Sequence, residues 1–158
     1  MSELGKEGGT KQTAGEGAGP AQGVVVGHGG MATGLVDAVR RIAGVGEDVL
    51  VPLSNDGKGP DALCEELARI MGAHRVVVFT DMQAGSCAMA ARVVCGGRLG
   101  QGLVAESRAV VCGVNLAMLL DFVFNRELPF DRLVPRLVEH GRAAVTGHMP
   151  HVDSAISG

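Results

Sequence analysis

The chain has almost no aromatic residues: its 158 residues include no Trp, no Tyr and only four Phe. Hydrophobic residues still make up 46% of the sequence, so any core must be built from Val, Leu, Ala, Ile and Met. The length suits one domain with a sizeable core and is short for two. We therefore expect a single globular domain with an aliphatic core.

An excess of charge of one sign and long apolar runs are also missing. Fourteen basic and 17 acidic residues give a formal net charge of −3, which provides no attraction to nucleic acid or to an anionic membrane. No apolar run approaches the roughly 20 residues that span a bilayer. No apolar segment follows the first lysines, as it would in a signal peptide. These absences predict a cytoplasmic protein that neither binds nucleic acid nor inserts into a membrane.

Cysteines are few, and none has the spacing typical of a metal site. The four cysteines lie in apolar stretches and form no CxxC pair. The simplest interpretation is therefore four reduced, buried thiols: Cys64, Cys87, Cys95 and Cys112. His148 and His151 offer at most a weak metal site in a segment that is more typical of a flexible tail. We expect no metal and no organic cofactor.

Composition divides the chain into three parts. Residues 1–22 are rich in Gly and polar residues, bury almost nothing and predict a disordered tail. Residues 23–147 carry the periodic apolar pattern of a folded domain. Residues 148–158 are predicted to form a flexible C-terminal tail.

Within the domain, short apolar runs alternate with helical patterns. Runs typical of strands covered on both faces occur at 24–26, 49–53, 76–79 and 109–112. Helical periodicity follows each run. The first helical segment ends at Gly44, and the later ones cover about 60–71, 86–94, 116–125 and 130–140. The alternation predicts a doubly wound α/β fold: a mainly parallel four-stranded sheet in the order 2-1-3-4 with helices on both faces.

Chemistry-bearing residues follow the strands at their carboxyl ends, where such sheets bind ligands. His28 comes after the first strand and Asp81 after the third, and these strands are neighbours in the predicted order. The two side chains should therefore face each other, with Ser86 at the start of the next helix. Helix N-termini offer N–H groups that suit phosphate, and the surrounding glycines leave room for it: Gly29, Gly30 and Gly85.

This combination suits phosphoryl transfer through a phosphohistidine. A neutral imidazole is a nucleophile, and a carboxylate bonded to one ring nitrogen exposes the lone pair of the other. Alternatives remain from the residues alone. His28 could satisfy a backbone carbonyl, and Asp81 and Ser86 could be helix caps. Cys87 could be a nucleophile whose pKa is lowered at a helix start.

Three stretches in register resemble the mannose-family EIIA domain of the bacterial phosphotransferase system: VVVGHGGMATGLVDAVRRIAG, FTDMQAGSCAMAAR and CGVNLAMLLDF. The resemblance implies a cytoplasmic carrier that takes a phosphoryl group from HPr and passes it to an EIIB domain. His28 matches the phosphorylated histidine, Asp81 the acid that pairs with it, and Ser86 the serine near the phosphoryl group. The family also implies a homodimer with an exchanged C-terminal strand, for which residues 141–149 are the candidate edge strand.

The chain departs from the family pattern in the loops. The second motif usually reads like DLFGGSPFN, with paired glycines, a proline and an asparagine; at those positions this chain has Ala84, Cys87 and Met89. The third motif usually reads GVNLPM, and Ala117 replaces its proline. A regulatory phosphorylation switch therefore fits as well as sugar uptake. Two alternatives stay open: a regulatory binding module that is not phosphorylated, and a phosphotransfer subunit of the dihydroxyacetone-kinase type.

Overall fold

A parallel sheet in the order β2-β1-β3-β4 forms the centre of the computed structural model, which describes residues 19–96 and 107–150. Its strands are β1 (Gln22–Gly27), β2 (Leu50–Ser54), β3 (Val76–Thr80) and β4 (Arg108–Cys112). The described helices are α1 (Met31–Ala43), α2 (Pro60–Met71), α3 (Ser86–Cys95), α4 (Leu116–Asn125) and α5 (Phe130–Ala143). The fold class and strand order predicted from the sequence are confirmed.

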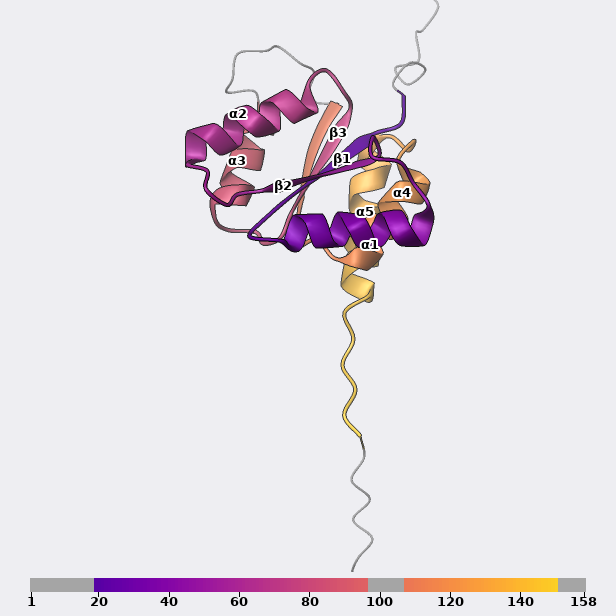
Figure 1. Ribbon diagram of the computed structural model, residues 1–158. Helices are drawn as coiled ribbons and strands as arrows, with labels where there is room; N and C mark the ends of the chain where they lie inside the picture. The colour runs from indigo at the N-terminus through magenta and orange to yellow at the C-terminus, as the bar shows by residue number, and fades with distance from the viewer. Residues whose placement is uncertain (1–18, 97–106, 151–158) are drawn as a thin grey trace, which may run out of the picture.

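Helices cover both faces of the sheet, which explains why the middle of each strand is apolar (Figure 1). In β1, Val25 packs in the core shared with α1, α4 and α5. Its neighbours Val24 and Val26 pack in the second core, with α2 and α3. Because successive strand residues point to opposite faces, a strand between two helical layers needs apolar residues at every position.

The helix ends are set by local sequence. Gly44 adopts a left-handed conformation with φ 66°, and its N–H donates to the carbonyl of Arg40, which closes α1. Pro60 occupies the first turn of α2, where its missing N–H costs nothing. Asn115 caps α4 by accepting a hydrogen bond from the N–H of Met118 at 2.9 Å.

Helix α5 is longer than the sequence pattern predicts, because Gly141 lies inside it instead of ending it. A Cβ at this position would lie 2.5 Å from Met118 Cε, so glycine permits the close approach of α4 and α5. Asn115 Nδ2 also donates to the Gly141 carbonyl at 2.9 Å. Within the described ranges, no helix has the length and apolar character needed to cross a membrane.

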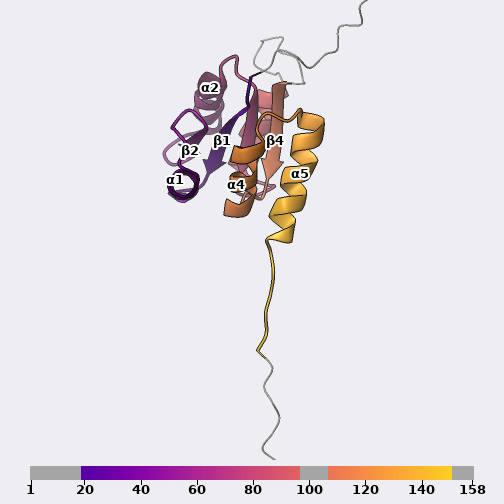
Figure 2. The same ribbon diagram turned by 90° about the vertical axis from the view of Figure 1, so that its right-hand side faces the viewer.

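The segment beyond α5 was expected to begin an edge strand at 141. In the described chain, residues 145–150 instead have no secondary structure and lead away from the domain in both views (Figures 1 and 2). Their apolar side chains are exposed, with Val145 at 77% and Met149 at 87%. An exchanged strand remains a prediction about an assembly of two chains.

The N-terminal boundary of the domain lies before the predicted one. Ala21 is fully buried and its N–H donates to the carbonyl of Arg126 at 2.9 Å. Gln22 belongs to β1 and donates through its N–H to the carbonyl of Arg75 at 2.8 Å. The composition of residues 1–22 predicts a tail that includes both residues, and the structure corrects this boundary. Residues 1–18 and 151–158, including His151, lie outside the described residues.

Candidate functional site

The pairing of β1 with β3 places His28 next to Asp81. The two strands are parallel neighbours, and their register pairs Val26 with Thr80 at the carboxyl ends. His28 and Asp81 follow within two residues of that pair, at the edge of the sheet where its strand order reverses. The proximity expected from the strand order is therefore observed.

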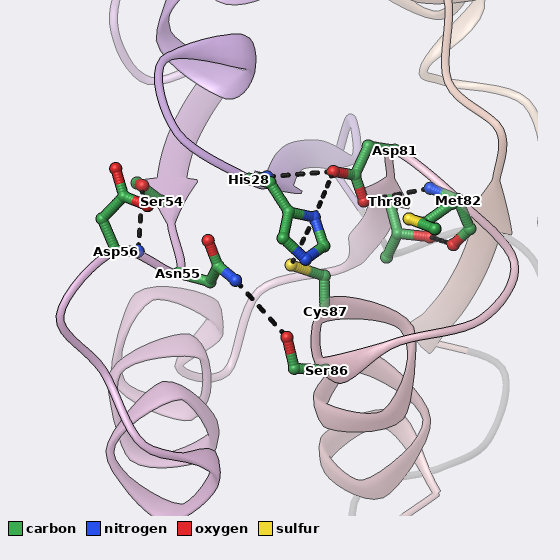
Figure 3. Close-up of polar contacts among 9 residues, drawn as sticks. All are labelled: His28, Ser54, Asn55, Asp56, Thr80, Asp81, Met82, Ser86 and Cys87. Carbon is green, nitrogen blue, oxygen red and sulfur yellow. Dashed lines mark hydrogen bonds and ion pairs between the residues drawn. The ribbon is translucent and has the colours of Figure 1, made fainter.

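One oxygen of Asp81 holds His28 at two points (Figure 3). Oδ2 accepts a hydrogen bond from the backbone N–H of His28 at 2.9 Å and lies 2.6 Å from its ring Nδ1. The other oxygen, Oδ1, accepts from the N–H of Met82 at 3.0 Å. An ionised carboxylate can only accept, so Nδ1 carries the hydrogen and a neutral ring keeps its lone pair on Nε2.

The environment keeps Asp81 ionised. Burial acts to raise the pKa of its carboxyl group, but the hydrogen bonds and charge of His28, with the bond from Met82, lower it below the ordinary value. The Asp81 side chain is only 9% exposed, whereas that of His28 is 48% exposed. The acid is thus anchored inside while the imidazole it orients stays open to another molecule.

Small residues surround the ring. Gly29 has φ 56° and Gly85 has φ 107°, conformations that favour glycine. A Cβ on Gly85 would lie 3.9 Å from His28 Cε1, whereas Gly29 and Gly30 have no heavy atom within 4 Å of such a Cβ. Gly30 is the N-cap of α1 and Gly85 that of α3. Two helix N-termini therefore flank the histidine without side chains that would obstruct an anion.

Ser86, the first residue of α3, contacts Asn55, which the sequence pattern did not indicate as a site residue. Asn55 directly follows β2 and donates through Nδ2 to Ser86 Oγ at 3.4 Å (Figure 3). Its backbone N–H donates to the carbonyl of Gly27, the last residue of β1, at 3.1 Å. Asn55 Oδ1 is buried and has no hydrogen-bond partner among the described residues. The sequence feature that could have identified Asn55 as a site residue is its position directly after β2, the strand that pairs with β1.

Cys87 also lies close to the histidine, a proximity that no sequence pattern indicates. Its buried Sγ lies 3.9 Å from His28 Nδ1. Burial raises the pKa of the thiol, and the charge of Asp81 raises it further, despite opposing hydrogen bonds at the helix start. The suggestion of a thiol with a lowered pKa is therefore wrong, because burial outweighs the helix terminus.

Comparison by sequence identifies a family. The sequence model of EIIA-man, described as "PTS system fructose IIA component", matches residues 22–129. This range contains His28, Asp81 and Ser86. No curated protein matches the chain.

Solved structures share the fold at low sequence identity. The phosphotransferase-system component EIIA from Streptococcus agalactiae is 21% identical with a TM-score of 0.71, covering 80% of this chain and 96% of its own. The mannose/sorbose-specific IIA subunit from Enterococcus faecalis is 22% identical with a TM-score of 0.69, covering 84% and 98%. A sigma-54 interaction domain protein from Enterococcus faecalis has a TM-score of 0.65 at 10% identity, covering 80% and 94%.

Proposed function

The chain belongs to the EIIA-man family of phosphotransferase-system components, and on this premise we propose that it is a cytoplasmic phosphoryl carrier with His28 as the acceptor. The observation that carries the proposal is the double contact of one Asp81 oxygen with the backbone N–H and ring Nδ1 of His28. This contact selects Nε2 as the nucleophile, since Nδ1 carries the hydrogen.

The transfer is a displacement at phosphorus. Nε2 of His28 attacks the phosphohistidine of HPr, a new N–P bond forms, and the N–P bond of the donor breaks as its imidazole leaves. The His28 ring gains positive character while keeping its hydrogen on Nδ1. The ionised Asp81 beside Nδ1 stabilises that charge, the role of an orienting carboxylate in catalytic triads.

Donors for the phosphoryl oxygens are available at the starts of α1 and α3. Ser86 is exposed at the first position of this helix, and Gly85 precedes it without a side chain. We assign Ser86 Oγ and the backbone N–H groups of Gly29, Gly30 and Gly85 to phosphate binding. Asn55 positions Ser86 through its 3.4 Å contact.

Exposed methionines mark the surface on which a partner would dock. Met31, Met82 and Met89 are 41%, 50% and 64% exposed, and each lies within three residues of a proposed site residue along the chain. Methionine is flexible and polarisable, and is common on surfaces that accept more than one partner. A carrier must dock with both its donor, HPr, and its acceptor, which supports this assignment. The acceptor is an EIIB domain or a regulatory target.

The test uses the full chain with enzyme I, HPr and phosphoenolpyruvate. The protein should gain a phosphoryl group that is lost in acid and stable in base, the behaviour of a phosphoramidate. His28→Ala should abolish the label, and His74→Ala, which replaces an exposed histidine after α2, should retain it. Circular dichroism checks that both variants fold.

Label on His28→Ala would overturn the assignment of the acceptor. A folded wild type that takes no label would favour the alternative of a regulatory binding module. A second experiment mixes the purified phosphorylated protein with an EIIB domain. In a transport role the label should move to EIIB, whereas in a regulatory role it should stay on this chain.

We also propose a homodimer in which residues after α5 pair with a second copy. In the single chain β4 is an edge strand, and Val145 and Met149 extend away from the domain. An unpaired edge and an exposed apolar segment both favour pairing between chains. Light scattering should give a dimer for the full chain and a monomer for a chain ending at Ala144. A monomeric full chain at micromolar concentration contradicts the proposal.

A further inference from the structure

We propose that His28, Asp81 and Cys87 form a binding site for a divalent metal ion of the zinc type, and that an ion bound there prevents phosphorylation of His28. The second part rests on the function proposed above, whereas the binding itself does not. No spacing in the sequence indicates this site, because the sheet brings His28, which follows β1, next to the segment from β3 to α3 that carries Asp81 and Cys87.

The three potential ligand atoms are already close. His28 Nδ1 lies 2.6 Å from Asp81 Oδ2 and 3.9 Å from Cys87 Sγ (Figure 3). One ligand atom from each of the three residues lies within 4.8 Å of the other two. Zinc binds nitrogen and oxygen at about 2.1 Å and thiolate sulfur at about 2.3 Å, so in tetrahedral geometry two ligand atoms of one ion lie about 3.4–3.6 Å apart. To admit the ion, Nδ1 and Oδ2 would move apart by about 0.8 Å and the sulfur would move closer by up to about 1.2 Å, which rotations of the three side chains can supply.

The chemistry of the ligands favours zinc over harder ions. Thiolate and imidazole select zinc and similar transition metals, whereas magnesium and calcium prefer oxygen ligands. Cys87 and the carboxylate of Asp81 are buried, but His28 is half-exposed, so an ion could enter from the side of the ring. Three protein ligands would leave a fourth position for water.

Metal binding and phosphorylation compete through the proton of one imidazole. With Asp81 as the partner, the hydrogen is on Nδ1 and Nε2 has the lone pair. An ion on Nδ1 takes the lone pair of that nitrogen, so the ring hydrogen moves to Nε2. Cys87 releases its thiol proton to solvent as the thiolate binds. Nε2 then has no lone pair with which to attack phosphorus.

The binding test uses the full chain freed of metal by a chelator and titrated with cobalt(II). Thiolate bound to cobalt gives a strong charge-transfer absorption in the near ultraviolet, which zinc should remove by displacement. The band should be present in the wild type and in Cys64→Ala, a matched control on α2, and absent in Cys87→Ala. His28→Ala should also lose the band; its half-exposed ring contributes little to packing, so this variant serves if Cys87→Ala does not fold.

The phosphorylation test compares each variant with itself. Zinc should reduce the initial rate of labelling of the wild type and Cys64→Ala, and a chelator should restore it. For Cys87→Ala the initial labelling rates with and without zinc should be nearly equal. That result would also show that zinc does not inhibit enzyme I or HPr.

The outcomes separate the two proposals. A cobalt band that survives both Cys87→Ala and His28→Ala, or no band in the wild type, overturns the metal site. A Cys87-dependent band in a chain that cannot be phosphorylated supports the site and overturns the proposed function. Zinc inhibition of Cys87→Ala equal to that of the wild type overturns the competition.

Discussion

Asp81 uses one oxygen for two N–H groups of His28: Oδ2 lies 2.9 Å from the backbone nitrogen and 2.6 Å from ring Nδ1. Its second oxygen is bonded to the N–H of Met82 at 3.0 Å. The backbone N–H of His28, its ring Nδ1–H and the N–H of Met82 are all donors, so residue 81 needs a side chain with two accepting oxygen atoms. Only a carboxylate meets that requirement among side chains of this size.

Asp81→Asn should therefore slow the phosphorylation of His28 without abolishing it. In one orientation the new NH2 group faces the N–H of Met82; in the other it faces His28 and favours the wrong tautomer. We expect a loss of about 10²–10⁴ in the initial rate, the range for orienting and acid–base groups. The rate is measured with enzyme I, HPr and phosphoenolpyruvate.

The matched control is Asp37→Asn, which removes an exposed carboxylate that pairs with Arg41 on the surface of α1. It should label at the wild-type rate. An Asp81→Asn variant that labels as fast as this control would show that the tautomer is not determined by Asp81.

Ser86→Ala should cost less than Asp81→Asn, because backbone N–H groups at the same helix start still hold the phosphoryl oxygens. Asn55→Ala should have an effect similar to that of Ser86→Ala, since Asn55 acts through its contact with Ser86 Oγ. The double variant should then be no slower than the slower single variant. Strictly additive losses in the labelling rate would show that the two residues act separately.

Gly23→Ala should destabilise the domain by about 1–3 kcal/mol through overpacking. A Cβ on this residue of β1 would overlap Leu50 Cδ2 and lie 2.9 Å from Phe122 Cε1. The control is Gly34→Ala in α1, where no heavy atom lies within 4 Å. That change should stabilise by about 0.5–1 kcal/mol, because alanine favours a helix interior. Urea unfolding measures both, and equal stabilities would contradict the packing described for β1.

Truncation should distinguish the two N-terminal boundaries. A chain starting at Gly19 should keep the Tm of the full protein. A chain starting at Gly23 should lose several degrees, because it lacks the buried Ala21 and the hydrogen bonds of Ala21 and Gln22. Thermal unfolding followed by circular dichroism gives both values. Equal melting temperatures would contradict this and would support a domain that begins at Gly23, as the composition predicts.

The order of elements and the strand-end position of His28 and Asp81 could be predicted from the sequence alone. Apolar runs such as Val76–Phe79 and the glycine or proline signals around each helix are local features, and short connections leave few possible topologies. Strand order then brings any residues that follow β1 and β3 to the same edge of the sheet.

Only the tertiary structure decided which side chains touch there. Asn55 contacts Ser86 and Cys87 approaches His28 across 31 and 59 positions of sequence, distances over which no local pattern carries information. Gly141 would end a helix on its own, but packing against Met118 keeps it inside α5. Local periodicity determines elements because it depends on neighbouring residues. Contacts, burial and the raised pKa of Cys87 depend on how separate elements pack, and packing is a property of the whole domain.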